Sequence, residues 1–188
     1  PPAASNPIDF TGEGCVDFDN TDGSWESLPG MRSNLYDRYM SLNFDWDGFV
    51  TNEISIGEDG TMYIGHDRGR SLNAYHANAG TTGQVYGNVF MKNLTDGRFA
   101  VVWDELNRDA NAKDMLSPGA NNTFQIVLSN LSSDYPQVCY CYEKMMWADA
   151  SQPSIVGVNH YTSNPPYTIG LFNREDNNWG GVGSSNNG

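Results

Sequence analysis

The alternation of apolar and polar residues over residues 40–47 is the feature that most constrains the fold of this chain. Every second position is apolar, with serine, asparagine and aspartate in between, and the apolar residues are Met40, Leu42, Phe44 and Trp46. Side chains of a β-strand point to opposite faces in turn, so a period of two predicts a strand with one buried face. No segment keeps the period of an amphipathic helix over three turns. The pattern therefore predicts an all-β fold.

Short segments of the same kind recur along the chain, separated by clusters of Gly, Asn, Ser and Pro. Asp59-Gly60 lies between two of them, 53–56 and 61–64, and predicts a β-hairpin. A loop is expected at 68–83, which is rich in Asn, Ala and Gly. Strands at this spacing indicate an antiparallel β-sandwich, with a barrel as the related alternative. The remaining strands are expected at 85–91, 98–103, 123–128, 137–142, 154–158 and 168–172.

The length of 188 residues fits one domain of ordinary size. Residues 1–39 contain many turn signals and predict an irregular segment with two short strand candidates, at 8–10 and 15–18. Residues 40–175 are expected to form the β-sandwich. Residues 176–188 form a tail rich in Asn, Gly and Ser.

Acidic residues dominate the charge of the chain, with 23 Asp and Glu against 10 Lys and Arg and a formal net charge of -13. This balance excludes nucleic-acid binding, which needs a basic surface. No apolar run approaches the roughly 20 residues that cross a bilayer, so no membrane span is expected. The numbering starts without Met, and we expect it to begin after a removed signal peptide.

Three acceptor sites for N-glycosylation, of the form Asn-x-Ser/Thr, begin at Asn93, Asn121 and Asn130. Each lies in or beside a predicted turn, where an attached glycan would not disturb a core. Their use would place the protein outside the cell. Only 18% of the residues are charged, which is typical of secreted β proteins. We therefore expect an extracellular protein, secreted or at the cell surface.

Two segments, in this order, resemble strands of the NIDO domain, the extracellular module of nidogen and alpha-tectorin. The first is Asn-Thr-Phe-Gln-Ile-Val-Leu at 122–128, preceded by Phe-Ala-Val-Val-Trp-Asp at 99–104. The second, at 138–147, is similar to the family's alternating pattern, with the apolar positions at Val138, Tyr140, Tyr142, Met145 and Trp147. The resemblance covers roughly residues 40–172. It implies a role in adhesion or matrix architecture, and it supplies no catalytic residues.

The cysteines are expected on the outer face of the sandwich. Cys139 and Cys141 lie two residues apart on a predicted strand and share one face, opposite the aromatic face that holds Tyr140. A secreted protein does not leave two thiols on its surface. Three cysteines cannot all pair within one chain. We expect Cys15 to pair with Cys139 or Cys141, which would hold the N-terminal segment across this face.

Several arrangements of the cysteines stay open. The cysteine left over is either a thiol or is bonded to another copy of the chain. All three cysteines could also be reduced and buried beneath the N-terminal segment. Zinc binding is a further arrangement, although two thiolates on one strand lack the turn of a zinc knuckle. Its ligands would be Cys15, Cys139 and Cys141 with one of His66, His76 or His160.

A weak calcium candidate is formed by the alternating carboxylates Asp17, Asp19 and Asp22. The spacing is not that of an EF-hand loop, because the following glycine lies one place late and no glutamate follows at the right distance. Apart from the zinc arrangement above, calcium is the only cofactor for which the sequence offers candidate ligands. Catalytic motifs are absent, with no Gly-x-Ser-x-Gly, no His-Glu-x-x-His and no phosphate-binding loop.

These features predict a non-enzymatic, extracellular structural or adhesion subunit that self-assembles into a surface filament or matrix, or binds other extracellular proteins. A segment that donates a strand to the edge of a neighbour's sheet would explain assembly. Its apolar residues would be Ile8, Phe10, Val16 and Phe18. The alternative is a glycan-binding module, in which exposed aromatic side chains stack on sugar rings and calcium or acidic side chains bind the hydroxyls. Separately, Trp46, Trp103 and Trp147 could line a sugar groove, although their spacing fits the core equally well.

Overall fold

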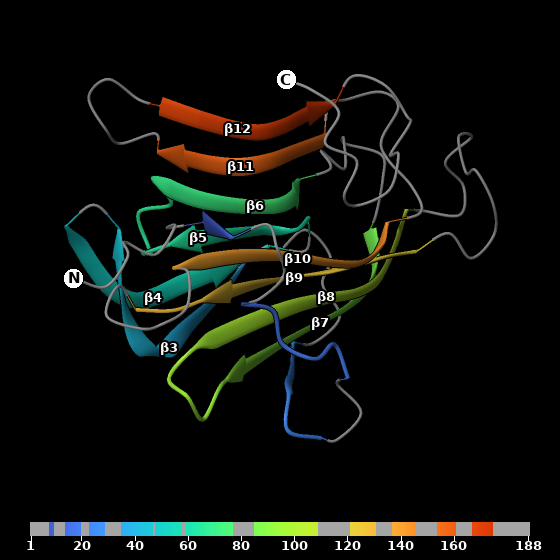
Figure 1. Cartoon of the computed structure of the whole chain (residues 1–188), viewed down its shortest axis with the longest axis horizontal. Coiled ribbons are helices and arrows are strands. Elements are labelled where there is room, and N and C mark those ends of the chain that lie inside the picture. Colours follow the sequence, from blue (N-terminus) through green and yellow to red (C-terminus); the bar gives the residue numbers. More distant parts are fainter. Residues whose placement is uncertain are drawn as a thin grey trace.

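The structure is a computed structural model, and it describes residues 8–9, 14–19, 23–28, 35–46, 48–57, 59–76, 85–108, 121–130, 137–145, 154–160 and 167–174. Every regular element in these residues is a β-strand, and the twelve strands form two six-stranded sheets (Figure 1). The sheets lie face to face and do not close into a barrel, which confirms the predicted β-sandwich.

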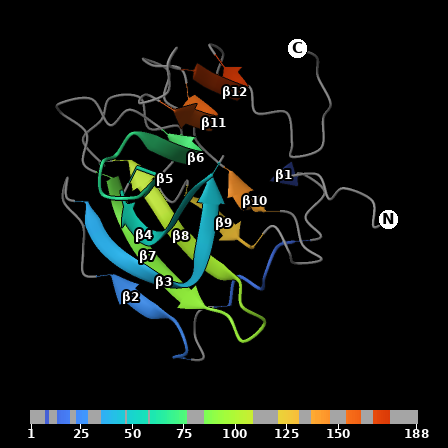
Figure 2. The ribbon, with the colours of Figure 1, turned by 90° about the vertical axis from the view of Figure 1, so that its left-hand side faces the viewer.

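The first sheet is built around the strands that resemble NIDO strands. Its order is β1 (Ile8–Asp9), β10 (Val138–Met145), β9 (Asn122–Leu128), β8 (Phe99–Arg108), β7 (Val85–Asn93) and β2 (Glu26–Leu28). All neighbours are antiparallel except β1 and β10, which are parallel. Figure 2 shows β1 beside β10. The sheet therefore takes both of its edge strands from the N-terminal segment.

The second sheet is entirely antiparallel. Its order is β12 (Tyr167–Arg174), β11 (Ser154–His160), β6 (Arg70–His76), β5 (Thr61–Ile64), β4 (Phe49–Ile56) and β3 (Tyr36–Trp46). The turn at Asp59-Gly60 joins β4 to β5, as the hairpin prediction requires. In β3 the four apolar residues of the alternating pattern are buried, and Ser41 and Asn43 between them are exposed.

The core between the sheets is aromatic. Trp103 of β8 and Phe124 of β9 are fully buried, and their rings stack with centroids 5.4 Å apart. Burial of such large side chains contributes about 1.5 to 3 kcal/mol each to folding. In β3, in β9 and in residues 99–103 of β8 the core is built from every second residue, which is one face of each strand.

Three aromatic residues of the first sheet, two of them buried and Tyr142 partly buried, donate hydrogen bonds to backbone carbonyls of second-sheet segments. The indole Nε1 of Trp103 donates to the Gly57 oxygen at 2.8 Å, and the hydroxyls of Tyr140 and Tyr142 donate to the oxygens of Gly157 at 2.9 Å and Ala74 at 2.8 Å. Burial raises the pKa of both tyrosines, so both hydroxyls stay protonated and keep donating. These bonds fix the two sheets against each other.

The prediction of a loop at 68–83 is wrong over residues 70–76, which form β6 between β5 and β11. The segment is rich in polar and small residues, so its sequence does not show a clear strand pattern. Leu72, Ala74 and Tyr75 of this strand belong to the core. The strand β3 also begins at Tyr36, inside the predicted irregular segment. Of the two early strand candidates, 8–10 contains β1, whereas 15–18 is not a strand. The tail at 176–188 lies outside the described residues.

Gly60 in the β4–β5 turn provides a test of how tightly the sheets pack. Its φ is +81°, and a Cβ atom there would meet the Tyr75 carbonyl oxygen and lie 3.0 Å from Cζ of Phe124. Gly97 has a similar φ of +85° with nothing within 4 Å of the added Cβ. We expect Gly60→Ala to lower the free energy of unfolding by about 3 kcal/mol or more, because clash adds to backbone strain.

The matched control, Gly97→Ala, should cost only about 1 kcal/mol, since it carries the strain of a left-handed backbone without the clash. Urea unfolding of the two variants and the wild type measures both values. Equal losses in the free energy of unfolding for the two variants would contradict the close packing of Gly60 against Tyr75 and Phe124.

Candidate functional site: the disulfide-anchored N-terminal segment

The outer face of the first sheet is apolar in its centre. The side chains on it come from β8, β9 and β10 and are at most 3% exposed: Ala100, Val102, Val127, Cys139 and Cys141. An apolar sheet face needs a partner that removes it from water. The partner is an extended stretch of residues 14–19, which we call the N-terminal cover. Cys15, Val16 and Phe18 of the cover pack on this face, together with Trp25.

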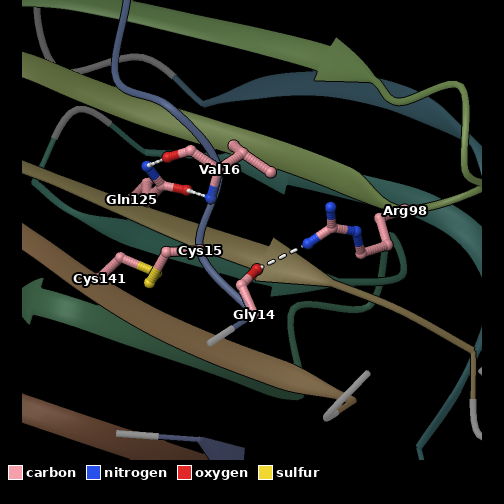
Figure 3. Close-up of a disulfide and its surroundings, with 6 residues drawn as sticks. All are labelled: Gly14, Cys15, Val16, Arg98, Gln125 and Cys141. Carbon is pink, nitrogen blue, oxygen red and sulfur yellow. Dashed lines mark hydrogen bonds between the residues drawn. A yellow bond between two sulfur atoms is a disulfide. The ribbon is translucent and has the colours of Figure 1, made fainter. Parts of the chain in front are cut away.

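A disulfide between Cys15 and Cys141 anchors the cover to β10 (Figure 3). The Cα atoms are 5.9 Å apart, and the two residues are separated by 126 positions in sequence. The bond is one of the two pairings expected from the sequence. The alternative in which all three cysteines are reduced is therefore wrong. Zinc binding by the three thiolates is also ruled out, since two of the sulfurs are bonded to each other.

Gln125 of β9 holds the cover beside the disulfide. Its side chain is fully buried; Oε1 accepts a hydrogen bond from the Val16 N–H at 3.1 Å, and Nε2 donates to the Val16 carbonyl oxygen at 2.8 Å (Figure 3). One amide side chain thus satisfies both backbone groups of a residue that lies on a sheet face, where no neighbouring strand can do so.

Arg98 holds the cover one residue before the disulfide. Its guanidinium donates to the Gly14 carbonyl oxygen at 2.8 Å. The same guanidinium is oriented by Asp96, through Nε at 2.8 Å and Nη2 at 2.7 Å from one carboxylate oxygen. The hydrogen bonds from Arg98 lower the pKa of Asp96, so the pair stays charged at neutral pH.

Trp25 holds the other end of the cover. Its indole Nε1 donates to the Asp19 carbonyl oxygen at 3.1 Å, and the Lys92 ammonium lies 5.4 Å from the centre of its ring. The cover is therefore fixed at both ends and in the middle, by one covalent bond and four hydrogen bonds.

Cys139 lies on the same face as Cys141 but outside the disulfide. It is only 1% exposed beneath the cover. A bond from Cys139 to another copy of the chain, which was one of the two expectations for the third cysteine, would require the cover to move away. The folded chain therefore keeps this sulfur inside.

The carboxylates proposed for calcium are used differently here. Asp17 and Asp19 are exposed, and the Asp17 carboxylate accepts a hydrogen bond from the Asp19 N–H at 3.0 Å. Asp22 lies outside the described residues. Within the described residues, no three His, Cys, Asp or Glu side chains gather closely enough to hold a metal ion.

The remaining predicted residues do not form a common site. Val16 and Phe18 pack on their own sheet, Ile8 belongs to β1, and Phe10 is outside the described residues. Trp46 and Trp103 are core residues and do not line a sugar groove, and Trp147 is outside the described residues. Asn93 is exposed at the end of β7, whereas Asn121 and Asn130 flank β9 and are half-buried.

The residues that hold the cover, Gln125, Arg98 and Trp25, were not predicted. Gln125 carried a signal, because it is the one polar residue between Phe124 and the apolar run Ile126 to Leu128. A buried polar side chain inside an apolar strand needs a partner, and here the partner is backbone from more than one hundred residues earlier in the chain. Arg98 and Trp25 have no comparable signal.

The two segments that resemble NIDO strands are neighbours in the first sheet. β9 and β10 pair antiparallel from Val138 opposite Leu128 to Met145 opposite Asn122. No protein-family model, curated protein or solved structure matches this chain. In the described part of the chain, no helix is long and apolar enough to cross a membrane.

Removal of the disulfide should loosen the cover and destabilise the whole domain. A closed loop of this length predicts a loss of about 2 to 5 kcal/mol in the free energy of unfolding for Cys15→Ala/Cys141→Ala. Unfolding of the wild type with and without a phosphine reductant should show the same loss. Cys139→Ala is the control, because its unfolding should keep the full response to the reductant. A reductant effect that vanishes in Cys139→Ala would contradict the assigned pairing.

Proposed function

We propose that this chain is a non-enzymatic structural or adhesion subunit that acts outside the cell, and that copies of it associate into a surface filament or matrix. The resemblance of residues 122–128 and 138–147 to NIDO strands supports an adhesive or matrix role. The disulfide supports an oxidising location, because such bonds form and persist outside the cytosol. The exposed Asn93 at the end of β7 supports it as well, as an accessible glycan acceptor.

The observation that carries the proposal is the parallel pairing of the short edge strand β1 with β10. β1 lies only along Val138 and Cys139. In the described part of the chain, no strand runs along the outer side of Tyr142–Met145. The backbone groups on such an edge can accept a further strand. An edge that takes up the N-terminal strand of its own chain can take up the same strand from a neighbour.

The opposite side of the sandwich is less suited to strand addition. There the edge strand β3 is bonded to the first sheet: Arg38 of β3 pairs with Glu26 of β2 at 3.3 Å, and the side-chain oxygen of Asn93 in β7 accepts a hydrogen bond from the Ser41 N–H at 2.8 Å. β3 also carries a β-bulge between Tyr39 and Phe44. Contacts between the two sheets and β-bulges at an edge strand protect that edge from pairing with another chain. This comparison favours association at the β1–β10 edge over association at β2 and β3.

Deletion of residues 1–9 tests this mode of association, because it removes β1 and leaves Cys15 and the cover in place. We expect the wild type to form higher oligomers as its concentration rises, and the deleted chain to sediment as a monomer. Deletion of residues 180–188 is the control of equal length. Sedimentation velocity and negative-stain electron microscopy measure the outcome. A wild type that stays monomeric, or a deleted chain that assembles equally well, would end the proposal.

A glycan-binding module is the second candidate, and a surface cluster favours it that consists of Tyr39 on β3, Glu53 on β4 and His66 after the end of β5. Tyr39 is 61% exposed, its ring lies edge-on to His66 with centroids 6.4 Å apart, and His66 Nε2 is 3.2 Å from the Glu53 carboxylate. Tyr39 and Glu53 are also cross-strand neighbours. An open aromatic face can stack on a sugar ring while the carboxylate and imidazole bind its hydroxyls.

A glycan array on monomeric protein, with and without a calcium chelator, tests this candidate. We expect Tyr39→Ala to reduce glycan binding at least about tenfold, because stacking on an aromatic face contributes a large share of such affinity. Val50→Ala is the control, since Val50 is exposed to a similar extent, at 58%, and lies elsewhere on β4. No binding by the wild type, or an equal loss in Val50→Ala, would exclude this cluster as a glycan site.

A further inference from the structure

β10 offers Cys15 two partners on the same face. Cys139 and Cys141 both belong to the apolar cluster under the cover. Two positions along a strand correspond to a separation of about 7 Å, so a small slide of the cover would bring Cys15 to either sulfur. In the structure Cys15 is bonded to Cys141, and Cys139 lies outside the bond. Because both sulfurs are within reach of Cys15, distance alone does not determine which of the two cysteines forms the disulfide.

The cross-strand neighbours of the two cysteines differ. Cys141 lies opposite Gln125, whereas Cys139 lies opposite Val127. With Cys15 at Cys141, the next residue, Val16, meets the Gln125 amide and both of its backbone groups are bonded. With Cys15 at Cys139, Val16 would shift to Val127, whose side chain can neither donate nor accept. Its N–H and C=O would then be left without these bonds against an apolar surface.

We propose that Gln125 sets the position of the N-terminal cover along β10, and thereby selects Cys141 rather than Cys139 as the disulfide partner of Cys15. Gln125 is a positioning residue in this role, since it contacts Val16 and not the sulfurs. The inference is independent of the proposed association between copies. It concerns which of two covalent isomers the folded chain adopts.

The two isomers interconvert without any net oxidation. The Cys139 thiol loses its proton, and its sulfur attacks Sγ of Cys15. A bond between Cys15 and Cys139 forms as the bond between Cys15 and Cys141 breaks, and the Cys141 sulfur leaves as a thiolate that takes up a proton. One thiol and one disulfide are present before and after the step. The ratio of the isomers at equilibrium therefore measures the preference that Gln125 imposes.

The test is the ratio of the two connectivities in the wild type and in Gln125→Met, which keeps the length of the side chain and removes both hydrogen bonds. Both chains are equilibrated in a glutathione redox buffer, alkylated and digested with chymotrypsin, which cuts after Tyr140 and so separates the two cysteines. Mass spectrometry then counts each linkage. We expect the ratio of the Cys15–Cys141 isomer to the Cys15–Cys139 isomer to fall by about tenfold to a hundredfold.

Trp25→Phe is the matched control, because it removes one hydrogen bond to the cover at Asp19 and leaves the position of Val16 unchanged. Its ratio should equal that of the wild type. A wild-type ratio in Gln125→Met would overturn the proposal, and so would an equal shift in Trp25→Phe, which would mean that any loosening of the cover has this effect.

A further variant keeps the test decisive if Gln125→Met does not fold. Gln125→Glu retains the acceptor for the Val16 N–H and loses the donor to its carbonyl oxygen. We expect its ratio to lie between those of the wild type and a chain without either bond, lowered by about fivefold to tenfold. An unchanged ratio in this variant would count against the proposal. Circular dichroism of the double variant with Cys139→Ala, which leaves a single partner, verifies the fold.

Discussion

The burial of β9 on both faces is the constraint on which the rest of the structure depends. All seven of its residues are buried, with Phe124, Ile126 and Leu128 in the core and the residues between them on the outer face. A strand buried on one side only can leave its outer side to water, but this one cannot. The first sheet therefore needs a second layer, and the chain supplies one from its N-terminal end.

The two sheets solve the problem of their outer faces in different ways. The second sheet places small polar side chains there, and these bond to one another or to the adjacent strand: Thr61 donates to Asn73 at 3.1 Å, and Ser55 donates to Asp37. The first sheet places apolar residues and two cysteines there and covers them. Ser55, Thr61 and Asn73 are as buried as the apolar residues under the cover, so the two sheets differ in the chemistry of their outer faces and not in whether these faces are buried. The apolar face of the first sheet is the one that carries the disulfide.

The sequence predicts the faces of the strands well and their partners poorly. The alternation at 40–47 and the hairpin at Asp59-Gly60 follow from local rules, and so does the outward direction of Cys139 and Cys141. β6 could not be predicted, because its core residues stand among Ser, Asn and Arg and become a strand only between β5 and β11. The choice between the two cysteines depends on Gln125 opposite Cys141, a relation between separate strands that no local pattern displays.

The order in which these parts can form gives the disulfide its role. The cover begins at residue 14, but the face it binds consists of β8, β9 and β10, which span residues 99–145. The cover has no surface to bind until these strands are paired, and bringing segments this distant together carries a large loop-closure cost. The weak, reversible contacts from Gln125 and Arg98 can align the cover on the finished sheet before any sulfur reacts. The disulfide then makes permanent a position that hydrogen bonds have selected, so the specificity of the site resides in Gln125 and its permanence in Cys15 and Cys141.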